Sequence, residues 1–192
     1  LLSVNIGPLC GVMRNRKKVL SGIFKQPIEG SIAVKKIGLV GDHQANKKLH
    51  GGKHKAICVY PAEHYEVWRS ELKKPNLYFG NFGENMTTLG LMEDFVCLGD
   101  RYRIGSTEMV IAQPREPCVT LNTHLGLKNF SKRFKESGRS GFYFSVVKEG
   151  SVKREDSIEC IYKDQNKVSI SEFNAVLNGV PGVNEIIRRA CQ

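Results

Sequence analysis

The chain has 192 residues, of which 41% are hydrophobic and 25% are charged, and its formal net charge at pH 7 is +10. This composition is typical of a soluble globular protein, and the length suits one domain with or without a small appendage. We expect no membrane span, because no run approaches roughly 20 apolar residues. We also expect no signal peptide, because residues 1–9 lack a basic start followed by a long apolar stretch. These features predict a cytoplasmic protein.

Short apolar segments rich in β-branched residues recur along the chain between turn residues, which predicts strands. In chain order they cover residues 19–24, 32–39, 56–60, 95–98, 102–104, 109–112, 142–147 and 158–162. Gly99-Asp100 and Gly105-Ser106 supply tight turns, so residues 95–113 are predicted to form a meander of antiparallel strands. Because helices do not alternate regularly with these strands, a closed sheet or barrel is favoured over parallel βαβ units.

Helices are predicted at 61–72 and 127–134, where aromatic and leucine side chains share one face. After Asn166 the pattern becomes helical. Ser169 and Glu172 form a capping box before one helix, and a glycine-containing break at 179–182 precedes another. The fold class is therefore mainly β with added helices: a β-barrel domain over residues 1–165 and a short helical appendage over residues 166–192.

Cys118 has the most distinctive surroundings of the six cysteines, which stand at positions 10, 58, 97, 118, 160 and 191. Their wide spacing favours neither a zinc cluster nor a disulfide framework. Cys58, Cys97 and Cys160 lie in apolar runs, and we interpret them as small core residues. Cys118 instead ends the segment Gln113-Pro114-Arg115-Glu116-Pro117-Cys118, where the prolines stop a strand. The guanidinium of Arg115 is close in sequence and favours thiolate over thiol, which suits a metal ligand or a nucleophile. A buried core residue is the third interpretation of Cys118, and all three stay open.

Polar segments with glycines are candidate binding loops. Asp42 precedes a basic loop that reaches His50-Gly51-Gly52, whose glycines allow backbone amides to approach an anion or serve a simple turn. Glu84-Asn85 follows a second glycine pair, and Arg139 lies within Gly138-Arg139-Ser140-Gly141, where it is either a ligand-binding cation or a solvated turn residue. No phosphate-binding P-loop, GxGxxG, GxSxG or HExxH motif occurs. The basic residues are scattered without aromatic interleaving, so a nucleic acid is the least favoured partner.

Seven segments in a fixed order resemble the MOSC-domain family, nearest its YiiM-like branch. They are GLVGDHQA (38–45), HGG (50–52), YPAEHY (60–65), FGENMTT (82–88), VCLGDRYRIG (96–105), QPREPC (113–118) and GRSGFY (138–143). The resemblance extends from residue 19 to residue 162, and residues 169–192 resemble a shortened form of that branch's three-helix appendage. It departs from the family at Lys53-His54, where many relatives carry Pro-Asp.

The resemblance implies a closed MOSC-type β-barrel that binds molybdenum on a pyranopterin cofactor, with Cys118 as the thiolate ligand. A thiolate suits such a soft, redox-active metal. Candidates to hold the cofactor or substrate are Lys25, His50, Gly51, Gly52, Asn85, Arg115 and Arg139, while Asp42 and Glu84 would orient loop backbone or pterin amino groups. The implied activity is reduction of N-hydroxylated compounds, such as hydroxylaminopurines or amidoximes, with electrons from a separate protein.

A second hypothesis is a sulfur carrier, in which Cys118 holds a persulfide received from a pyridoxal-phosphate-dependent cysteine desulfurase. A third is a nucleic-acid binder, suggested only by the net charge and ranked lowest. No lysine has a recognisable pyridoxal-phosphate context, so that cofactor would belong to the partner.

Overall fold

We analysed a computed structural model, which describes residues 1–14, 17–46 and 51–191. Its main element is an eight-stranded sheet with the strand order β13-β9-β10-β11-β7-β8-β1-β4. The strands of this sheet are β1 (Ser3–Ile6), β4 (Gln26–Pro27), β7 (Ile57–Pro61), β8 (Met86–Thr88), β9 (Arg101–Ile104), β10 (Thr107–Pro114), β11 (Phe142–Lys148) and β13 (Ile158–Tyr162). Neighbouring strands are antiparallel except β7 and β8, which are parallel and are connected through a helix.

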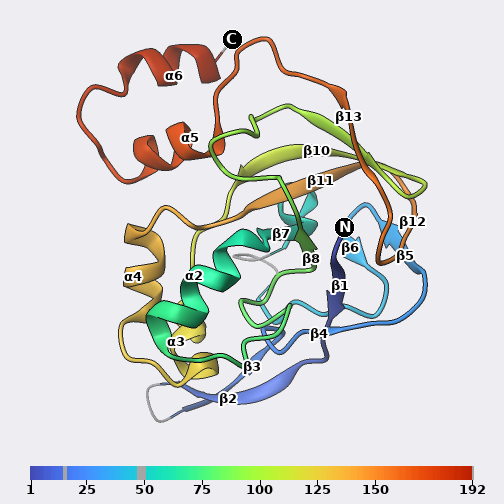
Figure 1. The fold of residues 1–192 in the computed structure, drawn as a ribbon, viewed down its shortest axis with the longest axis vertical. Coiled ribbons are helices and arrows are strands. Elements are labelled where there is room, and N and C mark those ends of the chain that lie inside the picture. The colour runs from blue at the N-terminus through green and yellow to red at the C-terminus, as the bar shows by residue number, and fades with distance from the viewer. Residues whose placement is uncertain (15–16, 47–50, 192) are drawn as a thin grey trace.

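The remaining elements lie around this sheet (Figure 1). A three-stranded sheet comprises β5 (Ile32–Lys35), β6 (Gly38–Leu39) and β12 (Gly150–Val152), and a hairpin comprises β2 (Cys10–Arg14) and β3 (Lys17–Ser21). The helices are η1 (Lys53–Lys55), α2 (Glu63–Leu72), α3 (Thr120–Leu125), α4 (Phe130–Glu136), α5 (Ile170–Leu177) and α6 (Asn184–Ala190). Figure 1 shows α2, α3 and α4 grouped beside the sheet, with α5 and α6 near the opposite end of the molecule. No helix of the described segments has the length and apolar character that crossing a bilayer requires.

The prediction of a closed barrel was wrong. The eight-stranded sheet curls into a half-barrel, and within the described residues its two edge strands, β13 and β4, do not pair with each other. β4 is only two residues long and contains Pro27, which has no backbone N–H to donate to a further strand. The mainly β class with added helices is confirmed.

Two of the predicted strands also differ from the structure. Residues 32–39 form the hairpin β5-β6 rather than one strand. Residues 95–98 are not a strand of the main sheet, because they bond to the segment that leads into α5: Leu98 N donates to Val168 O and Ile170 N donates to Val96 O. The predicted meander therefore reduces to the antiparallel pair β9-β10. The capping box at Ser169 and Glu172 is confirmed at the start of α5, whereas the division at residue 165 stays a prediction.

Two hydrophobic cores lie on opposite faces of the main sheet. Along β7, Ile57 and Val59 belong to the core on the concave side of the half-barrel, which we call the barrel core. Tyr60 points the other way, because side chains alternate along a strand. It packs with Trp68 of α2 and Phe134 of α4, whose rings are stacked with centroids 5.8 Å apart, in a second core beneath the helices. The helices therefore cover the face of β7 to which Tyr60 belongs.

Gly141, just before β11, is required by its surroundings. Its φ is +70°, and a Cβ there would lie 2.3 Å from Val59 O. We expect Gly141→Ala to lower the free energy of unfolding by about 2 kcal/mol more than Gly138→Ala, because Gly138 has φ +71° but no atom within 4 Å of a Cβ. Both variants carry the cost of a left-handed residue, about 1 to 2 kcal/mol. Urea unfolding measures the difference, and equal losses would contradict the steric argument.

Candidate functional site

A row of polar side chains crosses the main sheet on its helix-covered face. Tyr143 of β11 lies directly opposite Gln113 of β10 and Cys58 of β7. Next to Cys58 comes Asn85, whose backbone N donates to Cys58 O and whose backbone O accepts from Asn5 N of β1. Directly opposed residues share one face of a sheet, so these five side chains form one line, the polar row. The adjacent rows consist of core residues.

A buried ion pair adjoins this row at Asn85. Lys25 Nζ lies 2.5 Å from Asp42 Oδ1, and their side chains are 6% and 4% exposed. Asp42 Oδ2 accepts a hydrogen bond of 2.8 Å from Asn85 Nδ2, and Asp42 Oδ1 accepts another from Gly7 N. Asn85 Oδ1 in turn accepts from Cys58 N at 3.0 Å. Three predicted site residues, Lys25, Asp42 and Asn85, thus form one connected network next to a thiol.

Glu84 is fully buried, and its two carboxylate oxygens have different surroundings. Oε1 accepts hydrogen bonds from Tyr65 OH, Gly80 N and Thr87 Oγ1 at 2.5, 2.7 and 2.9 Å. Oε2 is buried without a hydrogen-bond partner in the described residues. Burial raises the pKa of the Glu84 carboxyl above its usual value, although these hydrogen bonds oppose the shift. The carboxyl therefore keeps a proton to higher pH than an exposed glutamate does.

Arg115 is a buried cation with an unused donor. Its Nη2 donates to Phe82 O, and its guanidinium lies 5.5 Å from the centre of the Phe134 ring. Arg115 Nη1 is buried without a hydrogen-bond partner in the described residues, like Glu84 Oε2. A buried donor without a partner typically costs about 1 to 3 kcal/mol, so natural proteins usually supply a water or ligand atom there. Arg115 and Glu84 thus each present an open hydrogen-bonding position.

Charges from these segments converge on Cys58, which sequence reasoning missed. Burial raises the pKa of the Cys58 thiol, and the positive charge of Arg115 opposes this rise. Glu84, Lys25 and Asp42 also act on the thiol, so they lie within electrostatic range of it. Cys58 is buried, as predicted, but it faces this cluster rather than the barrel core. Its place in the polar row follows from strand register, for which the sequence holds no local signal. The core prediction was wrong for Cys160, which is exposed on the edge strand β13.

Cys118 lies near the same residues, at the entrance to α3. Its side chain is half-buried, and its Sγ is 3.2 Å from Thr120 Oγ1. Burial raises the pKa of the Tyr143 hydroxyl, and the negative thiolate forms of Cys58 and Cys118 raise it further. Tyr143 is thus within electrostatic range of both sulfurs. The two thiols therefore belong to one neighbourhood on the helix-covered face.

The segment that follows the HGG motif lies over the polar row. Gly52 has φ +94° and precedes η1, whose His54 O accepts a hydrogen bond of 3.0 Å from Gln113 Nε2. His54 Nδ1 lies 3.3 Å from Ser145 Oγ on β11. Gly51 and Gly52 thus approach the end of the QPREPC strand, whereas the predicted residue His50 lies outside the described residues.

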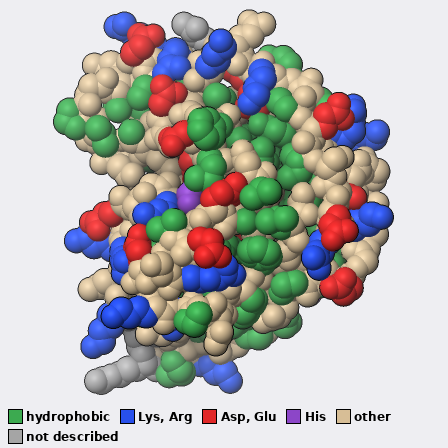
Figure 2. Space-filling view, in the orientation of Figure 1, with side chains coloured by type: hydrophobic (Ala, Val, Ile, Leu, Met, Phe, Trp, Pro, Cys, Tyr) green, Lys and Arg blue, Asp and Glu red, His purple; other side chains and the backbone are tan. Residues whose placement is uncertain are grey.

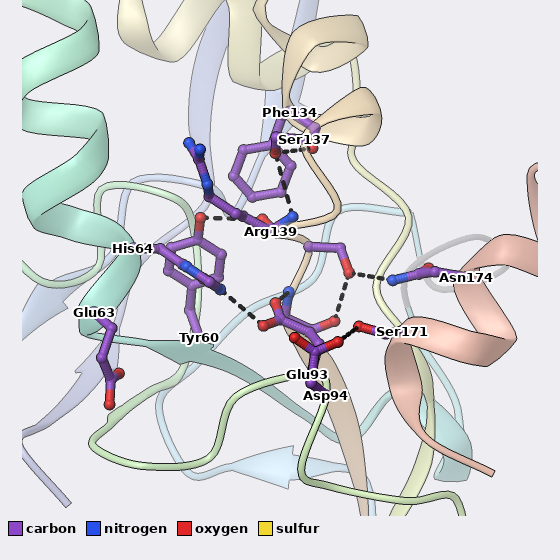
Figure 3. Close-up of polar contacts among 12 residues, drawn as sticks. Tyr60, Glu63, His64, Glu93, Asp94, Phe134, Ser137, Arg139, Ser171 and Asn174 are labelled. Carbon is purple, nitrogen blue, oxygen red and sulfur yellow. Dashed lines mark hydrogen bonds and ion pairs between the residues drawn. The ribbon is translucent and has the colours of Figure 1, made fainter.

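Arg139 belongs to a different group of contacts (Figure 3). Its Nη1 lies 2.9 Å from Glu71 Oε1 of α2, and its guanidinium stacks 4.8 Å from the Trp68 ring centre. Its carbonyl oxygen accepts a hydrogen bond from Tyr60 OH. The structure therefore does not bring the Arg139 side chain to the polar row.

The same view shows a second buried polar network, between α2 and α5. His64 Nε2 lies 2.8 Å from Glu93 Oε2, and Glu93 Oε1 accepts from Gly141 N at 2.7 Å. Asn174 Nδ2 of α5 donates to Ser140 Oγ at 2.8 Å. These contacts attach α5 to the GRSG segment (Figure 3).

His124 of α3 is another residue that sequence reasoning missed. Its ring meets the edge of Phe24 at 4.7 Å, and burial lowers the pKa of its imidazole. Both ring nitrogens are buried without a hydrogen-bond partner in the part of the chain that the structure describes. α3 itself was not predicted, because a six-residue helix directly after Pro117 has too little periodicity to detect.

The raised pKa of Glu84 predicts a pH dependence of stability. The folded-state pKa exceeds the reference value of 4.5, so the associated stability is present below about pH 4.5 and is lost as the pH rises through the folded-state pKa. Glu84→Gln, which cannot ionise, should therefore become more stable relative to the unsubstituted protein across that interval. Urea unfolding from about pH 5 to about pH 8 measures the difference. The exposed Glu136→Gln serves as the control, and a pH-independent difference for Glu84→Gln would contradict the argument.

Comparison with known proteins decides the family. A family model described as the MOSC domain matches residues 46–159, more than half of the chain. The chain belongs to the MOSC-domain family. This MOSC protein is 37% identical over 176 residues to the protein YflK of Bacillus subtilis, with 92% of this chain and 79% of YflK covered. The crystal structure of YiiM from Geobacillus stearothermophilus matches it with a TM-score of 0.76 and 33% identity, over 92% of this chain and 82% of that one. The resemblance to the YiiM-like branch is thereby confirmed.

A further relative carries a functional name. The MOSC protein is 32% identical over 163 residues to a Gibberella moniliformis protein named "Reductase". The match covers 83% of this chain but only 29% of that longer protein. The similarity thus concerns one part of a larger reductase.

Proposed function

We propose that this protein is a molybdenum-dependent reductase of N-hydroxylated compounds that receives its electrons from a separate electron-transfer protein. The observation that carries the proposal is the position of Cys118, a half-buried thiol that shares the neighbourhood of Tyr143 with Cys58 and its buried charges. The MOSC family and the relative named reductase support a redox role for such a site.

The residues at this site suit an anionic pyranopterin with a soft metal. Cys118 supplies the thiolate that a soft metal prefers, and the buried Arg115 guanidinium can donate to a phosphate oxygen. Arg115 Nη1 and Glu84 Oε2 offer a donor and an acceptor without partners, which match the mixed hydrogen-bonding edge of a pterin. Asp42 and Asn85 would keep Lys25 and the nearby backbone in place. When bound, the cofactor would transfer two electrons to the substrate.

The protein would contribute charge and protons to the reaction. Reduction of R–NHOH to R–NH₂ consumes two electrons and two protons, breaks the N–O bond and releases water. Burial raises the pKa of the Glu84 carboxyl, which would favour its protonated form relative to that of an exposed glutamate. The Arg115 guanidinium would stabilise negative charge that develops as the oxygen leaves. The helix-side core beneath α2 and α4 would limit access of water from that side.

A direct test is the reduction of 6-hydroxylaminopurine and benzamidoxime by protein purified from a host that makes the cofactor. A chemical reductant replaces the unknown electron donor, and formation of the purine amine or the amidine is followed chromatographically. Turnover above that of the same protein from a cofactor-deficient host is expected. Absence of turnover in a preparation that contains molybdenum would contradict the proposed function.

The sulfur-carrier function is a second candidate, because the Cys118 thiol is partly accessible to solvent and has a hydroxyl, Thr120 Oγ1, 3.2 Å away. Such a thiol can attack the persulfide of a partner protein and take over its outer sulfur. Incubation with a cysteine desulfurase and free cysteine, followed by mass spectrometry, would then show a mass gain of one sulfur on Cys118. An unmodified Cys118 would exclude this candidate.

A further inference from the structure

We propose that the substrate of this site carries an anionic group of the phosphate-monoester type, which Lys53 of η1 binds while the reacting end lies over the polar row. This inference rests on the proposed reductase function, because it names the class of N-hydroxylated compound that the site takes. The most favourable substrate would then be an N-hydroxylated nucleoside monophosphate rather than the free base.

The first support is the position of η1. Gln113 and Ser145, which hold His54 at 3.0 and 3.3 Å, both point to the helix-covered face. Ser145 follows Tyr143 by two residues on β11, so their Cα atoms are about 7 Å apart and their side chains share that face. η1 therefore lies at the edge of the neighbourhood that contains both thiols, within reach of a ligand of nucleotide size.

The second support is the charge of η1. Its three residues, Lys53 to Lys55, are all basic, and its first turn contains no acidic residue. Lys53 and His54 are exposed, and a Cβ at the preceding Gly52 would meet no atom within 4 Å. By contrast, the exposed Lys35 of β5 is paired: its Nζ lies 3.3 Å from Glu149 Oε2. The ion pairs of the described residues do not include Lys53, so its charge is available to a ligand.

The third support is the contrast with the interior of the site. The Lys25 charge is balanced by Asp42 at 2.5 Å, and the Arg115 guanidinium is buried and donates to Phe82 O. Both buried cations are thus already held by partners inside the protein, whereas Lys53 is exposed. On the face shown in Figure 2, basic and acidic side chains are interspersed, so the net charge is not concentrated there.

These features favour a ligand that is neutral at its reacting end and anionic at its outer end. A lysine ammonium binds phosphate as a point charge without requiring a fixed geometry, and Lys53 is exposed to solvent. Because such a contact is present before and during the reaction, it should lower KM and leave kcat nearly unchanged.

The test compares three substrates with the cofactor-loaded protein: N6-hydroxyadenine, N6-hydroxyadenosine and N6-hydroxyadenosine 5′-monophosphate. We expect kcat/KM for the monophosphate to exceed that for the nucleoside by about tenfold, as for one charge-assisted hydrogen bond. Lys53→Glu should abolish this preference through KM and leave the free base unaffected. Lys132→Glu makes the same charge change on exposed α4 and should preserve the preference.

Equal kcat/KM values for nucleoside and monophosphate, or a preference that survives Lys53→Glu, would overturn the inference. If none of the three compounds is reduced, the proposed reductase function is contradicted. The proposed anion site at Lys53 can then still be tested by binding measurements. Calorimetry with adenosine 5′-monophosphate and adenosine then decides: tighter binding of the monophosphate that Lys53→Glu and added salt both weaken supports the anion site. Equal binding of the two compounds contradicts it.

Discussion

Cys118→Ala is expected to lower reductase activity by more than about 100-fold, because loss of a group that merely supports a metal ligand already costs about 10- to 100-fold. The substitution should change the free energy of unfolding by less than about 1 kcal/mol, since the side chain is half-buried and lies outside both hydrophobic cores. Steady-state kinetics and urea unfolding of the same preparations separate the two effects.

The matched control is Cys160→Ala. Cys160 is an exposed cysteine on the edge strand β13, so its replacement should leave activity and stability unchanged. Activity of Cys118→Ala within a factor of about three of the unsubstituted protein would show that the thiol has no part in the reaction. A large loss of stability in Cys118→Ala would instead indicate a structural role for the thiol.

Lys25→Met is expected to reduce the free energy of unfolding by about 3 to 5 kcal/mol, because it leaves the Asp42 carboxylate buried without its cation. Among the described residues, Asp42 would keep the neutral hydrogen bonds from Gly7 N and Asn85 Nδ2. The double variant Lys25→Met/Asp42→Asn removes that charge and should regain part of the loss. Urea unfolding measures all three proteins.

The control for this pair is Lys35→Met. Lys35 pairs with Glu149 at 3.3 Å, but the two side chains are 57% and 38% exposed. Solvent screens such a pair, so its loss should cost less than about 1 kcal/mol. Equal losses for Lys25→Met and Lys35→Met would contradict the view that the Lys25–Asp42 pair organises the site.

Local sequence signals predicted the features that depend on neighbouring residues. The capping box at Ser169 and Glu172 placed the start of α5, because its two hydrogen bonds join residues three positions apart. Strand β7 and helix α2 were likewise visible as an apolar run and an aromatic face. The ordered motifs identified the family, since seven segments must agree.

Features that depend on strand register and on distant contacts could not be predicted. The polar row joins residues from four strands with Asn85, which directly precedes β8. The role of Cys58 appears only once β7 is aligned with β11 and Asn85. Barrel closure was favoured by the strand pattern and implied by the family resemblance, but Pro27 and the shortness of β4 leave an edge. Lys25 and Asp42 were each predicted as site residues. Their ion pair was not predicted, because it joins two residues 17 positions apart that only the fold brings together.

The most direct test of the central claim is the molybdenum and pterin content of the protein purified from a cofactor-competent host. We predict about one molybdenum by elemental analysis and one fluorescent pterin, after oxidation, per chain of the unsubstituted protein and of Cys160→Ala, with molybdenum lost from Cys118→Ala. Molybdenum and pterin no higher than in an unrelated protein purified from the same host would contradict the claim.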